Sequence, residues 1–140
     1  MSATATAQRP VPVSTRRIRG TAAVSATLAT SVLYLGARVL GTDFRITDPG
    51  KTEAHQLILP EIMVFTALFA LLGWGALAVL ERVTHHAKAA WTVLAVTVLA
   101  LSFVPIGIEQ ATPATKVMLA VIHIAVAITL VPMLRTPARG

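Results

Sequence analysis

Four long apolar stretches constrain the fold of this chain more than any other feature of its sequence. They cover residues about 21–40, 57–80, 89–107 and 115–134. Each is close to the roughly 20 residues that an α-helix needs to cross about 30 Å of hydrocarbon. Lipid cannot satisfy backbone hydrogen bonds, and no stretch shows the alternation of a transmembrane strand. The sequence therefore predicts an all-α fold, a transmembrane antiparallel four-helix bundle.

The charges support a membrane protein and argue against nucleic-acid binding. Only 13% of the residues are charged, the mean hydropathy is +0.73 and the formal net charge is +6. The basic residues sit at the ends of the apolar stretches, where they face lipid headgroups, and aromatic residues are too few for base stacking. Cysteine is absent, which excludes disulfides and thiolate catalysis. We expect membrane lipids as partners, with a possible homo-oligomer or another membrane protein, and no nucleic acid.

The chain divides into one membrane domain and two tails. Residues 1–17 lack apolar periodicity and are predicted to be a disordered basic cytoplasmic tail. Residues 18–135 form the four-helix domain, and 136–140 a second cytoplasmic tail. The first apolar stretch could instead be a cleaved signal peptide. It is long, however, and offers no convincing cleavage site, which favours a retained span.

The distribution of basic residues predicts the orientation. Eight lie on one side of the spans and four on the other. The larger group is expected in the cytoplasm, so both termini face inward, in a bacterial inner membrane. The first group is Arg9, Arg16, Arg17, Arg19, Arg82, Lys88, Arg135 and Arg139, and the second is Arg38, Arg45, Lys51 and Lys116.

Residues 41–56 make an outer loop with two possible states. Asp48-Pro49-Gly50 is a strong turn signal. The loop is long for a connection in a bundle, so it either folds over the outer end of the helices or stays mobile.

Polar side chains inside the spans are the candidate functional residues, because a charge at the bilayer centre costs at least about 2.5–3.5 kcal/mol on insertion scales. One such residue from each span lies in the outer half or middle of the membrane. Tyr34 shares a helix face with Arg38, and an Arg38–Glu61 ion pair is one possibility. All of them could instead only pack helices together. The candidate ligand-binding residues are Arg38, Glu61, Ser102, His123 and Tyr34.

Other chemical signals are weak. His85 and His86 point about 100° apart on a helix, so we expect a wet cytoplasmic turn and no metal site. Ser102 and His123 lack an orienting acid and an oxyanion hole, so catalytic residues and cofactors stay unknown. Trp91 fits an interfacial anchor, and Gly73-Trp74-Gly75 a region of close helix packing.

Several landmarks resemble one family. Leu80-Glu81-Arg82 closes the second span, Trp91-Thr92-Val93 opens the third, and Leu101-Ser102 with Pro105 follows. His123 lies inside the fourth span, which ends in Val131-Pro132 and Leu134-Arg135. Over residues 20–135 the chain resembles domain-of-unknown-function family 6069, short four-span bacterial membrane proteins. The resemblance implies the topology and supplies no reaction.

Three functions fit these observations. The first is a non-enzymatic bundle that self-associates or assists an envelope partner. The second is a small-molecule or proton-linked binding or transport component with an outward-facing pocket. The third is a membrane enzyme that uses His123 as a base or ligand.

Overall fold

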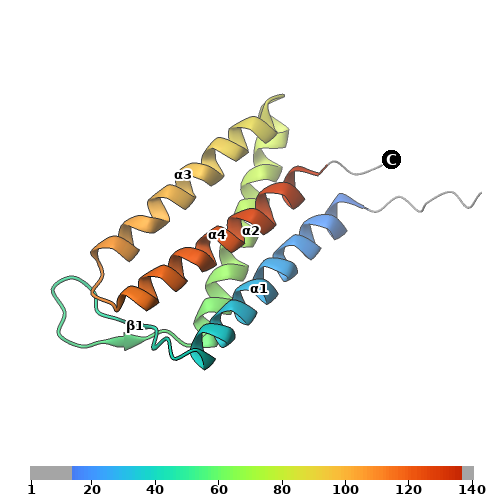
Figure 1. Cartoon of the computed structure of the whole chain (residues 1–140). Helices are drawn as coiled ribbons and strands as arrows, with labels where there is room; N and C mark the ends of the chain where they lie inside the picture. The colour runs from blue at the N-terminus through green and yellow to red at the C-terminus, as the bar shows by residue number, and fades with distance from the viewer. Residues whose placement is uncertain (1–13, 137–140) are drawn as a thin grey trace, which may run out of the picture.

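Each apolar stretch forms one helix in the computed structural model, which describes residues 14–136. The helices are α1 (Thr15–Val39), α2 (Leu59–Val83), α3 (Ala87–Ile108) and α4 (Pro113–Arg135). At 22–25 residues and 1.5 Å per residue, each is about 33–38 Å long and can cross a bilayer. Successive helices run in opposite directions (Figure 1). The predicted all-α, transmembrane, antiparallel four-helix bundle is confirmed.

Three of the four helices begin before the predicted spans, and side-chain caps mark the starts of α1 and α4. α1 begins at Thr15, six residues before the predicted span, and the Ser14 side chain accepts a hydrogen bond from the N–H of Arg17. α4 begins at Pro113 behind the side-chain cap of Thr112. α1 thus starts inside the segment predicted as a tail, whose remainder, residues 1–13, lies outside the described residues, as do residues 137–140.

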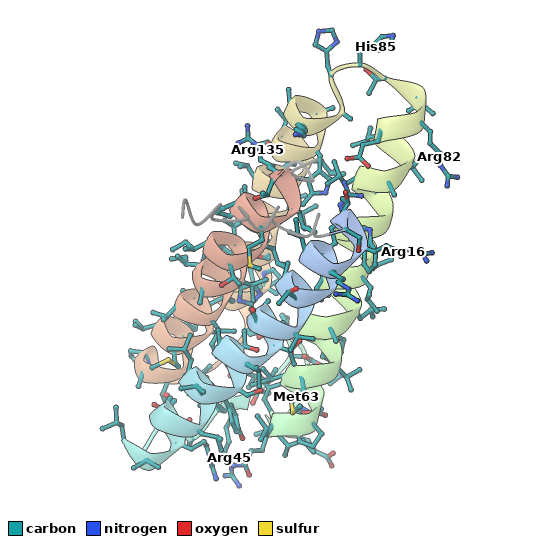
Figure 2. All side chains as sticks on the ribbon, turned by 90° about the vertical axis from the view of Figure 1, so that its right-hand side faces the viewer. Arg16, Arg45, Met63, Arg82, His85 and Arg135 are labelled. Carbon is teal, nitrogen blue, oxygen red and sulfur yellow. The ribbon has the colours of Figure 1, made fainter. Side chains whose placement is uncertain are left out.

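In cross-section the four helices lie at the corners of a square. α1 contacts α2 and α4, α3 contacts the same two helices, and α1 and α3 lie diagonally opposite. We call the end where α1 begins and α4 ends the terminal end, and the opposite end the hairpin end. Figure 2 shows Arg16, Arg82, His85 and Arg135 toward the terminal end and Arg45 toward the hairpin end.

Two clusters of buried side chains hold the bundle together. In the terminal half, the small residues Ala22 and Ala26 of α1 and Ala70 of α2 let larger side chains approach closely. The whole cluster is Ala22, Ala26, Ala70, Leu77, Trp91, Leu130 and Leu134. The hairpin half contains Tyr34, Ala37, Phe44, Ile62, Leu119 and Ile122. Between the clusters the buried hydroxyls of Thr30 and Thr66 lie 3.3 Å apart and link α1 to α2.

Trp91 is buried rather than interfacial, which corrects the prediction from sequence. Its side chain is part of the terminal cluster, and its Nε1–H donates to the carbonyl oxygen of Gly73 at 2.8 Å. A Cβ on Gly73 would lie 3.8 Å from the indole, so the ring packs directly on the α2 backbone there. Close helix packing at Gly73 is thus confirmed, with Trp91 as the packing partner.

The segment between α1 and α2 folds over the hairpin end. β1 (Arg45–Ile46) pairs antiparallel with β2 (His55–Gln56), and Thr47 exchanges backbone hydrogen bonds with Gln110 of the α3–α4 connection. Phe44 is fully buried, and its ring centroid lies 4.6 Å from that of Tyr34. Of the two predicted states, the structure has the folded one.

The outer surface of the bundle is apolar along all four helices. Many large hydrophobic side chains are more than half exposed, such as Val32 on α1, Phe65 on α2, Leu101 on α3 and Ile128 on α4. Soluble monomers do not leave contiguous apolar surface of this size open to water. With four helices long and apolar enough to span a bilayer, the chain is a multi-pass membrane protein.

Candidate functional site

Arg38 and Tyr34 hold the hairpin segment in place from α1. The Nη1 of Arg38 donates to the carbonyl oxygen of Asp43 at 3.2 Å, and the Arg38 side chain is exposed. The Tyr34 hydroxyl donates to the carbonyl oxygen of Leu57 at 3.0 Å, and the residue is buried against Phe44. Arg38 therefore binds the start of the loop, and Tyr34 binds its end.

Glu61 caps α2 and contacts the hairpin. Its carboxylate accepts a hydrogen bond from the N–H of Ile58 at 3.0 Å and lies 3.1 Å from Nε2 of His55. A carboxylate in the first turn also suits the positive end of the helix dipole. The Arg38–Glu61 ion pair, one of the possibilities raised by the sequence, is not among the salt bridges of the described residues. The folded hairpin supplies a nearer partner to each side chain.

Ser102 and His123 hydrogen-bond to the backbone of their own helices. The Ser102 hydroxyl donates to the carbonyl oxygen of Leu99 at 2.6 Å. Nδ1 of His123 lies 2.7 Å from the carbonyl oxygen of Leu119, and since a carbonyl can only accept, Nδ1 carries the proton. The imidazole also faces Phe103 of α3, with ring centroids 6.1 Å apart. These bonds satisfy polar groups inside the membrane without a neighbouring helix.

The candidate residues thus fall into two groups. Arg38, Tyr34 and Glu61 surround the hairpin, whereas Ser102 and His123 lie on α3 and α4. Two open surface depressions among residues 14–136 lie elsewhere, one at the terminal end and one at the loop tip around Lys51. Neither is lined by any of the five candidates.

Two polar contacts were missed by sequence reasoning, and the first joins the hairpin segment to α4. The buried hydroxyl of Thr115 donates to Oδ1 of Asp43 at 2.8 Å. This bond, together with one from the N–H of Arg45, holds the pKa of Asp43 below its ordinary value. In the sequence, the only sign of this contact is a threonine in the first turn of the fourth helix. Asp43 reaches it only because of the path that the folded loop takes.

The second missed contact is an ion pair at the terminal end. Arg19 of α1 is 8% exposed, and its Nη2 lies 2.5 Å from Oε1 of Glu81 on α2. The Nε of Arg19 is buried and has no hydrogen-bond partner among the described residues. In the sequence, Arg19 is one of several basic residues beside the first span, and nothing distinguishes it from its exposed neighbours Arg16 and Arg17.

The described residues contain no group of three or more His, Asp or Glu side chains arranged to hold a metal ion. The His55–Glu61 pair offers two donor groups. His85 and His86 are exposed in the α2–α3 turn. Two donors are fewer than the three or four protein ligands of an ordinary zinc site.

Comparison with known proteins places the chain in one family. A family model described as "Family of unknown function (DUF6069)" matches residues 10–140. The match extends the resemblance found from residues 20–135 and confirms it. No curated protein and no solved structure matches the chain.

Proposed function

We propose that this chain, which belongs to the DUF6069 family of unknown function, is a non-enzymatic membrane protein that works by contacting other transmembrane helices. The contacting helices belong to a second copy or to an envelope partner. Two features support the proposal. The polar side chains inside the bundle hydrogen-bond locally, and α3 buries few of its side chains.

The polar side chains of the spans support a structural rather than a catalytic role. Thr27, Ser31 and Ser102 donate to carbonyl oxygens of their own helices, as His123 does. Thr30 and Thr66 contact each other. Catalysis needs polar groups that meet at one substrate position, and these side chains are instead spread along the helices and paired locally.

The surface of α3 is the observation that carries the proposal. Its only buried residues are Ala87 and Trp91, both within the first five residues of the helix. From residue 92 to residue 108 no side chain is buried, whereas α1, α2 and α4 each bury residues along their whole length. Transmembrane helices associate by van der Waals packing of such faces. A helix from another chain would complete the packing that α3 lacks.

The proposed orientation has both termini in the cytoplasm of a bacterial inner membrane. Within residues 14–136 the terminal end carries six basic side chains and one acid, whereas the hairpin end carries four basic side chains and five acids. An excess of Lys and Arg marks the cytoplasmic side. The resemblance to short bacterial four-span proteins supports the choice of membrane.

Single-cysteine crosslinking in native membranes tests the proposed contact, because the chain has no cysteine of its own. Leu101 on α3 and Leu28 on α1 are 62% and 59% exposed and lie at similar distances from the starts of their helices. We expect oxidation to give disulfide-linked dimers of Leu101→Cys and none of Leu28→Cys, if the partner is a second copy.

A photo-crosslinking amino acid at position 101 tests a different partner. We expect an adduct with one other membrane protein if no disulfide dimer forms. If neither the cysteine nor the photo-crosslinker at position 101 gives more product than the same groups at position 28, the helix-contact proposal fails.

The other two functions have less support. An outward-facing pocket would need a depression that joins Arg38, Glu61, Ser102 and His123, and none of these four residues lines either of the two depressions described above. An enzyme that uses His123 would need a second polar group at the ring. The imidazole faces the ring of Phe103 on α3 and hydrogen-bonds to the carbonyl oxygen of Leu119. Both functions stay predictions, and ligand-dependent stabilisation of the purified protein that Arg38 and His123 variants lose would favour the pocket.

A further inference from the structure

An open depression lies at the terminal end and is lined by residues from the end of α2, the start of α3 and the end of α4. Figure 1 shows where these helices end and begin. The volume of the depression is about 540 Å³, and it is open to the surroundings rather than enclosed. Its polar lining residues are Glu81 from α2, Thr84, His85 and His86 from the turn, Lys88 from α3 and Arg135 from α4.

The depression carries an excess of positive charge. Neither Lys88 nor Arg135 forms an ion pair with any residue in the described range 14–136. Glu81 is the one acid among the lining residues, and its carboxylate is paired with the buried Arg19. Because Arg19 neutralises this acid from inside the bundle, the charges of Lys88 and Arg135 are left for a ligand.

The first turn of α3 adds hydrogen-bond donors to the same depression. Residues 87–89 line it, and the first N–H groups of a helix have no acceptor within the helix. The N-cap residue, His86, makes no side-chain hydrogen bond to them, and the first turn contains no acid. Unpaired N–H groups together with two cations are the donor set that binds a phosphate oxygen.

The position of the depression selects the source of the phosphate. It lies where apolar helices end, at the depth of lipid headgroups. Val83, the last residue of α2 and next to the lining residue Thr84, is 71% exposed. Such a side chain contacts the glycerol or acyl carbons of a lipid and offers nothing to a free phosphate ion. Among the lining residues that the structure describes, no acid without an ion-pair partner is present to attract the amine of a zwitterionic headgroup. We propose that this depression binds the headgroup phosphate of an anionic phospholipid.

Native mass spectrometry of the full chain in detergent, titrated with phosphatidylglycerol or phosphatidylcholine, tests the site. We expect tighter binding of phosphatidylglycerol. Each basic side chain near an anionic lipid contributes roughly fivefold in affinity, so Lys88→Gln with Arg135→Gln should weaken binding by roughly thirtyfold. Lys88→Arg with Arg135→Lys keeps both charges and should restore binding. A circular-dichroism spectrum of each variant shows that the helices are intact.

The matched control is Arg16→Gln with Arg82→Gln. It removes the same charge from the same end of the bundle (Figure 2), from residues that do not line the depression. We expect its affinity for phosphatidylglycerol to stay within about threefold of the wild type, because exposed charges outside the site are screened. Equal losses in the two double variants would overturn the proposal, as would equal binding of the two lipids. Displacement of phosphatidylglycerol by equimolar inorganic phosphate would also overturn it and identify a soluble phosphate as the ligand.

Discussion

Replacement of Trp91 by alanine should weaken the contact of α3 with the rest of the bundle. Trp91 is 3% exposed, and it is the only large side chain that α3 buries. Its indole donates to the carbonyl oxygen of Gly73 on α2 and belongs to the same buried cluster as Leu134 on α4. Trp91 is therefore the one large side chain of α3 that is buried where this helix meets α2 and α4.

The magnitude follows from two contributions. In water-soluble cores a Trp→Ala change costs about 3–5 kcal/mol, which combines transfer from water with the cavity left behind. In a membrane the unfolded reference is lipid rather than water, so mainly the cavity contribution remains, and the hydrogen bond adds about 0.6 kcal/mol. We expect a loss of about 2–4 kcal/mol for Trp91→Ala. Trp91→Phe keeps most of the ring and should lose about 1 kcal/mol.

Reversible unfolding in mixed micelles of mild detergent and sodium dodecyl sulfate, followed by circular dichroism, measures these losses. Trp74 stays as the one tryptophan of each Trp91 variant, and its fluorescence gives a second probe. The control is Leu28→Ala on the exposed face of α1, with an expected loss below about 0.5 kcal/mol. If Trp91→Ala were no less stable than Leu28→Ala, α3 would be held in the bundle by contacts other than Trp91.

Three further predictions concern polar contacts. Glu81→Gln leaves Arg19 buried without its acid and should lower the free energy of unfolding by about 1–3 kcal/mol. This is below the range for fully buried pairs because the Glu81 side chain is 37% exposed. An unchanged unfolding midpoint would show that the pair contributes nothing. Since the folded pKa of Asp43 is lowered, its contribution to stability is present above the ordinary pKa and is lost as the pH falls through the folded pKa. Asp43→Asn, which can still accept from Thr115, should remove this acid-induced loss in thermal unfolding measured from pH 2 to 7, and identical pH profiles for the two proteins would contradict the assignment. His123→Leu should change stability by less than about 1 kcal/mol, because the lost bond lies within one helix, and a loss of folding would instead show that the ring is needed between α3 and α4.

The sequence by itself determined the number of helices, their type and most of their length. Lipid offers the backbone no hydrogen-bond partners, so each long apolar stretch has one available structure, and its ends follow from charges and caps. The depths of Arg38, Glu61, Ser102 and His123 follow in the same way from the rise per residue. Family membership also rested on landmarks visible in the sequence and was confirmed over residues 10–140.

Only the tertiary structure decided which side chains meet. Helix rotation and loop path depend on how particular side chains fit together, and apolar spans with weak amphipathicity do not encode that fit. The burial of Trp91 against Gly73 needed the α2–α3 contact, and the Asp43–Thr115 bond needed the folded hairpin. Glu61 likewise contacts His55 rather than Arg38 because the hairpin lies across the end of the bundle. In a membrane, depth is a property of one helix, whereas contact is a property of two.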